Sequence, residues 1–162
     1  MSVFNFKTTH MLVFFSTVSV FFISLFSQIL FEKVPCQLCL VTRYIFLSIA
    51  VFSLTSIKLK KFRPLLVVAA SLAFSFSLYH LGVENHWWAG PQSCISELPT
   101  LESFNNAEQL TNNAKSYCDK VNWKIFGVSS TLWSFLFAAF VFWMVSLAYI
   151  LNYYLGKIEN DD

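Results

Sequence analysis

The chain has 162 residues, of which 56% are hydrophobic and 12% are charged, and its formal net charge is +2. Soluble domains carry about 25% charged residues, so this composition excludes an ordinary water-soluble domain. The small net charge also gives no basis for a nucleic-acid partner. We therefore predict an all-α integral membrane protein, surrounded by a lipid bilayer, whose single domain covers residues 1–162.

Four apolar segments are each long enough to cross a bilayer, which takes roughly 20 residues of helix. They cover about residues 11–31, 38–57, 64–81 and 132–151. The first segment is long for a signal peptide and lacks a small-x-small cleavage site, so we interpret it as a retained span. The sequence thus predicts a bundle of four transmembrane helices.

Basic residues predict the orientation of this bundle, because short loops rich in Lys and Arg stay in the cytoplasm. The connection at about residues 58–63 carries four of them: Lys58, Lys60, Lys61 and Arg63. We therefore expect this hairpin and both termini in the cytoplasm. The loops at about residues 32–37 and 82–131 are then expected on the outer side.

The longer outer loop has a helical pattern of its own. Its apolar residues recur at spacings of three and four: Leu98, Leu101, Phe104, Ala107, Leu110, Ala114 and Tyr117. This pattern predicts a short amphipathic helix between the two cysteines of the loop. The next segment, residues 121–131, mixes apolar and basic side chains and is expected to lie in the membrane interface. Ser129 and Ser130 are expected N-caps of the fourth span.

The four cysteines all fall on the outer side or at its boundary. They are Cys36, Cys39, Cys94 and Cys118. An oxidising compartment supports disulfides, so we expect the pairs Cys36–Cys39 and Cys94–Cys118. The second pair encloses 23 residues and is either a structural staple of the loop or a second redox pair.

The Cys36-x-x-Cys39 motif allows several kinds of site. A zinc site needs a second pair of ligands, and Cys94 and Cys118 do not form a second CxxC, so no metal site is predicted. A c-type haem site needs histidine after the second cysteine, and that position is Leu40. A structural disulfide across two residues closes almost no loop and stabilises little. A redox dithiol is the interpretation that remains, with the positive end of the second helix beside it.

Arg43 lies four residues after Cys39, which is one helical turn further on the same face. Arginine is costly inside a span and its presence there favours a functional role. The alternative is that the side chain snorkels to the membrane interface. In the functional interpretation, the cation stabilises a Cys39 thiolate or a polar oxygen of a bound ligand.

Three polar residues, His80, Glu84 and His86, cluster where the third span ends. They could be metal ligands, but they follow no clear ligand pattern. We therefore interpret them as polar groups at the membrane interface.

The combined features resemble the DsbB family, the disulfide-generating oxidoreductases of bacterial inner membranes. The resemblance rests on the four spans, on "PCQLCLVTRY" at residues 35–44 and on the cysteine pair of the outer loop. It also rests on Trp123, Gly127 and Trp133 at the entry to the fourth span. The likeness covers nearly the whole chain.

The resemblance implies a role for the membrane-proximal residues. Cys39 would interact with ubiquinone or menaquinone, and Arg43 would support quinone binding. Cys36 would exchange disulfides with the loop. Glu84 and His86 would be the polar residues near the quinone.

The resemblance also implies a protein partner. Cys94 would form a mixed disulfide with a periplasmic thiol oxidase that has a thioredoxin fold and resembles DsbA, and Cys118 would resolve it. The outer loops would then lie in the periplasm.

Two alternatives remain open at this point. An enzyme similar to vitamin K epoxide reductase also combines a loop pair with a CxxC in four helices, but its CxxC lies late in the chain. A non-catalytic membrane protein with structural loop disulfides would show no dependence on quinone.

Overall fold

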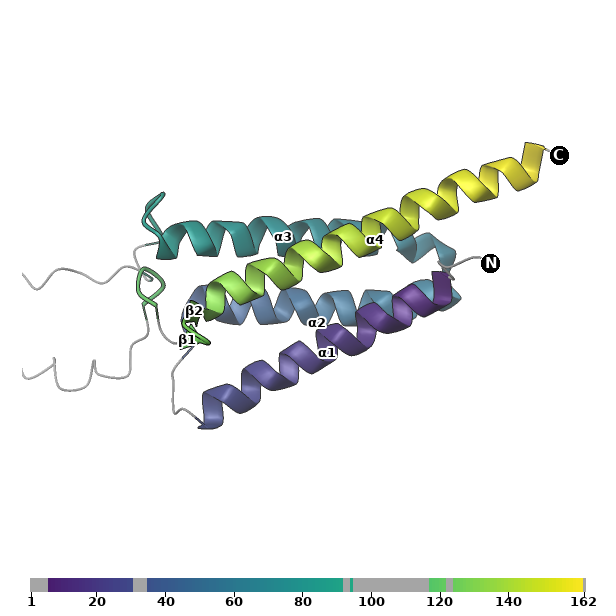
Figure 1. Cartoon of the computed structure of the whole chain (residues 1–162). Helices are drawn as coiled ribbons and strands as arrows, with labels where there is room; N and C mark the ends of the chain where they lie inside the picture. Colours follow the sequence, from purple (N-terminus) through teal and green to yellow (C-terminus); the bar gives the residue numbers. More distant parts are fainter. Residues whose placement is uncertain (1–5, 31–34, 92–93, 95–116, 122–123, 162) are drawn as a thin grey trace, which may run out of the picture.

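The computed structural model describes most of the chain outside the long loop. The described residues are 6–30, 35–91, 94, 117–121 and 124–161 (Figure 1). Four long helices dominate them: α1 (Phe6–Leu30), α2 (Gln37–Lys58), α3 (Arg63–Glu84) and α4 (Ser130–Asp161). Each is long and apolar enough to cross a membrane. The predicted four-helix all-α architecture is therefore confirmed.

The helices extend beyond the segments that the sequence predicts as spans. For example, α1 begins at Phe6 and α3 continues to Glu84. Hydropathy marks only the part of a helix that lies in hydrocarbon, whereas helical hydrogen bonding continues where polar residues follow. The loop after α3 consequently begins later than expected, after residue 84.

The bundle has two chemically different ends (Figure 1). We call the end that holds Cys36, Cys94 and Cys118 the thiol end. The opposite end, the basic end, holds the short helix η1 (Lys60–Phe62), which joins α2 to α3. Both termini lie toward the basic end, and α4 extends beyond the other helices there (Figure 1). Toward the thiol end, α1 diverges from the other three helices (Figure 1).

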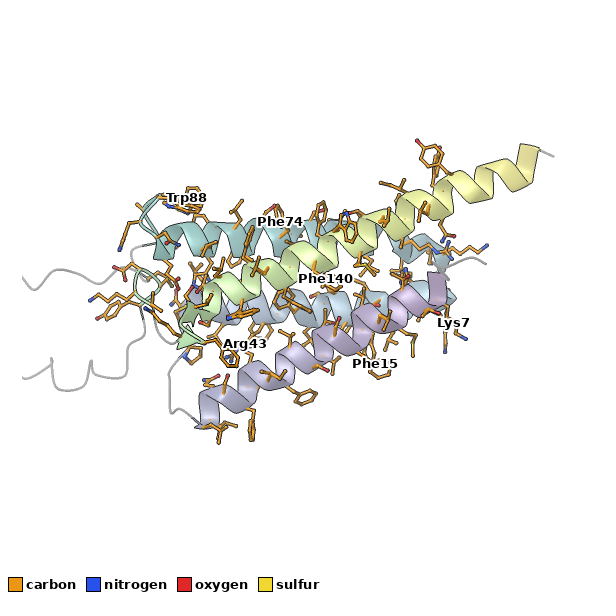
Figure 2. All side chains as sticks on the ribbon, in the orientation of Figure 1. Lys7, Phe15, Arg43, Phe74, Trp88 and Phe140 are labelled. Atoms are coloured by element: carbon orange, nitrogen blue, oxygen red, sulfur yellow. The ribbon has the colours of Figure 1, made fainter. Side chains whose placement is uncertain are left out.

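Small side chains bring α2, α3 and α4 together. Alanines at positions 69, 70 and 73 of α3 and at position 138 of α4 are buried in the main core. Such residues let helix backbones approach closely within a membrane. Large apolar residues cover the outside of the bundle, and Phe15 points away from it (Figure 2). This distribution suits a bundle surrounded by lipid.

A tight turn ends α3 at the thiol end. Trp87 N–H donates to the Gly82 carbonyl at 2.9 Å and His86 N–H to the Val83 carbonyl at 3.2 Å. His86 has a left-handed φ of 58°, so these bonds form the pattern of a Schellman cap with His86 at its C′ position. Trp88 then folds back over Gly82, where a Cβ atom would lie 2.0 Å from the indole ring.

A small hairpin precedes α4, which the sequence did not predict. Strand β1 (Lys124–Ile125) pairs antiparallel with β2 (Val128–Ser129). The two turn residues, Phe126 and Gly127, both have positive φ, at 52° and 79°; this is a requirement of the type I′ hairpin turn. Ser129 Oγ accepts a hydrogen bond from Leu132 N–H at 3.2 Å, so Ser129 is confirmed as the N-cap of the fourth span. Ser130, the other predicted N-cap, is instead the first residue of α4.

The amphipathic helix predicted within residues 98–117 lies outside the described residues, apart from Tyr117. It stays a prediction.

Candidate functional site

The CxxC motif forms the N-terminal cap of α2. Cys36 is the N-cap residue, and its Sγ accepts a hydrogen bond from Cys39 N–H at 3.3 Å. In return, Cys36 N–H donates to Cys39 Sγ. These reciprocal bonds have the arrangement of a capping box, with sulfur in place of oxygen. Both sulfurs therefore lie at the positive end of the α2 dipole, as the sequence predicts.

The four cysteines converge into one cluster although they come from three segments of the chain. Cys36 Sγ lies 2.8 Å from Cys39 Sγ. The Cys118 side chain shares hydrogen bonds with both Cys36 and Cys94, and Cys118 N–H donates to the Cys94 carbonyl at 2.8 Å. Cys36, Cys39 and Cys118 are free thiols in this structure. Their contacts give a continuous order of sulfurs: Cys94, Cys118, Cys36, Cys39.

Burial divides this cluster into an inner part and an outer edge. Cys36, Cys94 and Cys118 are each 1% exposed, whereas Cys39 is half-buried. A thiol held away from water reacts mainly with groups brought directly to it. The cluster can therefore exchange disulfides internally, with Cys39 at its open edge.

The environment of Cys118 perturbs its thiol strongly. Its hydrogen bond with Cys36, in which the Cys118 thiol donates, raises the pKa of Cys118 above its usual range, and burial raises the pKa further. Leu38 N–H, in the first turn of α2, donates to Cys118 Sγ and acts in the opposite direction. The reduced Cys118 is consequently a protonated thiol whose sulfur faces the N-terminus of α2.

His80 joins the cluster from α3. Its side chain is buried, and its Nε2 lies 3.5 Å from Cys36 Sγ. The sequence placed His80 among polar groups at the end of a span and gave it no role in redox chemistry. The available signal was its position inside an apolar segment, where an ionisable residue favours function. Its proximity to Cys36 depends on the packing of α3 against α2.

A cavity of about 440 Å³ adjoins the cluster. Ligand pockets typically have volumes of about 300–1,000 Å³. Its lining combines apolar side chains with a few polar groups, mostly from α1, α2 and α4: Val20, Phe21, Ile23, Ser24, Ser27, Gln28, Pro35, Cys39, Thr42, Arg43, Phe46, His80, Phe126, Ser130, Thr131, Trp133, Ser134 and Phe137. Cys39 thus connects the sulfur cluster to a cavity suited to a largely apolar ligand.

Arg43 lines the same cavity and is anchored to α1. Its Nε donates to Ser24 Oγ at 2.7 Å, one terminal nitrogen donates to Gln28 Oε1 at 2.5 Å, and the other donates to the Ser24 carbonyl at 3.1 Å. Figure 2 places Arg43 at the thiol end, between α1 and the start of α4. A guanidinium carries five N–H donors. The bonds to α1 use three of them, so two remain for an oxygen of a ligand.

Ser24 and Gln28 are site residues that the sequence analysis did not single out. They lie four residues apart on α1 and hence on one helix face. Polar residues at this spacing in an apolar helix were the available signal. Only the contact between α1 and α2 identifies Arg43 as their partner.

Phe126 forms an unusual edge of the cavity. It lines the cavity from the hairpin turn, yet 95% of its surface is exposed. Positive φ is strained for a bulky residue. An exposed aromatic ring held in this conformation suits a position where lipid or a ligand covers it.

The structure brings together five of the predicted site residues and leaves two apart. The four cysteines form one cluster, and Cys39 and Arg43 share the cavity. Glu84 and His86 do not line it. His86 instead ends α3 in the left-handed conformation described above, and His80 lines the cavity.

A membrane bundle that gathers four thiols beside an apolar cavity defines a membrane thiol oxidoreductase. The chain belongs to the DsbB family, because the family model described as "Disulfide bond formation protein DsbB" matches residues 6–150. The resemblance noted from the sequence is thereby confirmed. No curated protein and no solved structure matches the chain. Family membership makes this protein a membrane oxidoreductase of disulfide bond formation.

Proposed function

We propose that the protein re-oxidises a periplasmic, thioredoxin-fold partner resembling DsbA and passes the electrons to ubiquinone or menaquinone. The observation that carries this proposal is the order of sulfurs from Cys94 through Cys118 and Cys36 to Cys39, which ends at the cavity. In a bacterial inner membrane, the thiol end would face the periplasm. The cations around η1 support this orientation, with both termini in the cytoplasm.

The first half of the cycle oxidises the partner. A partner thiolate attacks Cys94 Sγ of the oxidised Cys94–Cys118 pair, and Cys118 leaves as a thiolate. The second partner thiolate then attacks the mixed disulfide and displaces Cys94. The partner departs with a disulfide, and Cys94 and Cys118 are both reduced.

The second half transfers this reduction to the CxxC. Cys118 Sγ attacks Cys36 Sγ of the oxidised Cys36–Cys39 pair, and Cys39 leaves as a thiolate. Cys94 then attacks Cys118 Sγ, which re-forms the loop disulfide and leaves Cys36 and Cys39 reduced. Both steps join sulfurs that share hydrogen bonds in the structure. Little movement is therefore needed, and proximity of this kind accelerates exchange.

The cavity then serves the final oxidation of Cys36 and Cys39. A bound quinone supplies an acceptor for two electrons and two protons, and the Cys36–Cys39 disulfide re-forms. The N–H groups of Arg43 that are not bonded to α1 would hold an oxygen of the quinone. His80 Nε2, at 3.5 Å from Cys36 Sγ, is placed to take the proton of the Cys36 thiol as the bond forms.

The energetics explain why a membrane-borne acceptor is needed. DsbA is a strong oxidant with a potential of about −120 mV, whereas structural disulfides have potentials below about −300 mV. Since about 30 mV corresponds to about 1.4 kcal/mol for two electrons, a disulfide of the second kind would face roughly 8 kcal/mol uphill. The cavity at Cys39 offers access to a stronger oxidant dissolved in the membrane.

Turnover with a soluble quinone tests the proposal. Purified protein is mixed with a reduced thioredoxin-fold partner and a short-chain quinone, and the loss of quinone absorbance is followed. We expect catalytic turnover that disappears in the Cys39→Ser variant. Absence of turnover, or full turnover in Cys39→Ser, would refute the redox cycle and favour a non-catalytic membrane protein.

The order of the cysteines needs a separate test. The Cys118→Ala variant removes the disulfide partner of Cys94. A single-cysteine partner, activated as its thionitrobenzoate disulfide, should then form a stable mixed disulfide at Cys94 and release thionitrobenzoate. Peptide mapping that places the link at Cys36 would overturn the assigned order.

A further inference from the structure

Three buried side chains at the thiol end could hold a metal ion. Cys36 Sγ, Cys118 Sγ and a ring nitrogen of His80 all lie within 4.8 Å of one another. They come from the cap of α2, the segment before the hairpin and α3. The proposed disulfide cycle uses Cys36 and Cys118 for thiol exchange and His80 as a base. It gives the three residues no role in metal binding.

The donor types match those of zinc. Thiolate and imidazole are the ligands that Zn²⁺ prefers, usually four of them in a tetrahedron. Bond lengths of about 2.3 Å to sulfur and about 2.0–2.1 Å to nitrogen place tetrahedral donors roughly 3.5–3.8 Å apart. Since the three donors lie within 4.8 Å of one another, they need to close by about 1.3 Å at most.

Cys39 is the candidate for a fourth ligand, although it lies outside the group of three donors and must move toward Cys118 and His80 to join them. Its Sγ lies 2.8 Å from Cys36 Sγ, and two residues between the cysteines is a spacing found in zinc sites. The sequence alone argued against zinc because Cys94 and Cys118 do not form a second CxxC. The fold replaces that second motif with one loop cysteine and His80.

We propose that the fully reduced protein binds one Zn²⁺ ion through Cys36, Cys39, Cys118 and His80. Each cysteine thiol that binds the ion releases its proton to solvent, and no electrons are transferred. A Cys36–Cys39 disulfide removes two ligands, and a Cys94–Cys118 disulfide removes one. The site therefore exists only when both pairs are reduced, and a bound ion holds the sulfurs that must form the next disulfide.

Cobalt titration tests the site without relying on turnover. The protein is purified in detergent without a polyhistidine tag, reduced, and freed of reductant under anaerobic conditions. We expect Co²⁺ to give sulfur-to-cobalt charge-transfer absorption and tetrahedral d–d bands that saturate at one equivalent. Zn²⁺ should abolish these bands, and competition with a chromophoric chelator gives its affinity. The oxidised protein should bind at least about 100-fold more weakly.

Variants identify the ligands. Cys118→Ser and His80→Ala should each weaken Zn²⁺ binding by about 100-fold or more. His80→Cys, which restores a ligand atom, should retain binding, so a loss in His80→Ala cannot be ascribed to misfolding. His86→Gly removes an exposed histidine at the same end of the bundle and is the matched control. Its affinity should be unchanged.

Two results would overturn the site. One is equal Zn²⁺ affinity for the oxidised protein or for His80→Ala; the other is a cobalt spectrum without sulfur charge transfer. Neither measurement uses quinone or the protein partner. Failure of the metal site is therefore distinguishable from failure of the proposed redox cycle.

Discussion

Each end of the bundle buries a histidine, and the two histidines have different neighbours. At the basic end, His10 Nδ1 lies 2.5 Å from Ser56 Oγ and 3.3 Å from the Ser53 carbonyl. At the thiol end, His80 Nε2 lies 3.5 Å from Cys36 Sγ and the side chain lines the cavity. Both histidines are 4% exposed, so burial does not distinguish them.

The neighbours decide what each histidine can do. Ser53 Oγ also donates to the His10 carbonyl at 2.5 Å, so His10 and two serines join α1 to α2. Hydrogen bonds of this kind hold helices together in a membrane. His80 instead contacts a reactive sulfur beside a space for a ligand. The comparison shows that two equally buried histidines differ in their neighbours, and these neighbours are the basis for the reactive role proposed for His80.

The largest expected effect concerns one cation at each end of the bundle, Arg43 at the thiol end and Lys61 at the basic end. Arg43→Gln should raise the KM for quinone about 10- to 100-fold, because a hydrogen bond to a charged group contributes about 1.5–3 kcal/mol and about 1.4 kcal/mol is tenfold. Lys61→Gln removes an exposed cation at the basic end and should leave KM unchanged. Steady-state kinetics over a quinone series measures both. Equal effects of the two variants would show that Arg43 acts only through overall charge.

The histidine comparison itself can be tested by a pair of alanine variants. His80→Ala should lower turnover at least about tenfold, since a proton acceptor beside the reacting sulfur is lost. His10→Ala should instead lower the free energy of unfolding by about 1–3 kcal/mol, because the buried contacts of the imidazole ring with Ser56 Oγ and the Ser53 carbonyl are lost. Turnover and thermal unfolding are measured in the same detergent. If His80→Ala lost stability but kept its turnover rate, both histidines would have a structural role only.

The pH dependence of stability should involve Cys118 at the thiol end. The pKa of its thiol is raised in the folded protein, whereas an unfolded chain has a cysteine pKa of about 8.5. Above that pH, the unfolded state loses the proton while the folded state keeps it, so stability falls as pH rises. The unfolding temperature of the reduced protein should therefore decrease between about pH 8.5 and pH 10.

Cys118→Ser is the control for this pH effect. Serine does not titrate in this range, so the decrease should be smaller in the variant. An identical decrease in both proteins would assign the effect to other groups.

The smallest effect is expected at His86, which lies at the thiol end but outside the cavity. His86→Gly should increase the free energy of unfolding by about 1 kcal/mol, because glycine adopts the left-handed conformation without the penalty of a Cβ atom. His86→Ala keeps this penalty and should give no increase. The KM for quinone should be unchanged in both, and a rise would restore the cofactor role that the resemblance implied for His86.

The sequence by itself determined the four helices and the candidate redox cysteines. Long apolar segments have few alternatives to a membrane-spanning helix, because every backbone polar group must be hydrogen-bonded within the bilayer. The spacing of Cys36 and Cys39 indicated a redox dithiol, and one helical turn placed Arg43 below it. Each of these inferences depends on residues close together in the chain.

Only the tertiary structure decided which distant residues meet at the site. His80 is 44 positions from Cys36 in the chain, and the partners of Arg43 on α1 are 15 and 19 positions away. Such contacts depend on how the helices pack, and helix periodicity alone does not specify this. The same packing leaves His86 outside the cavity and gives His80 a position beside sulfur. Local patterns thus identified the chemistry, and packing between helices assembled it.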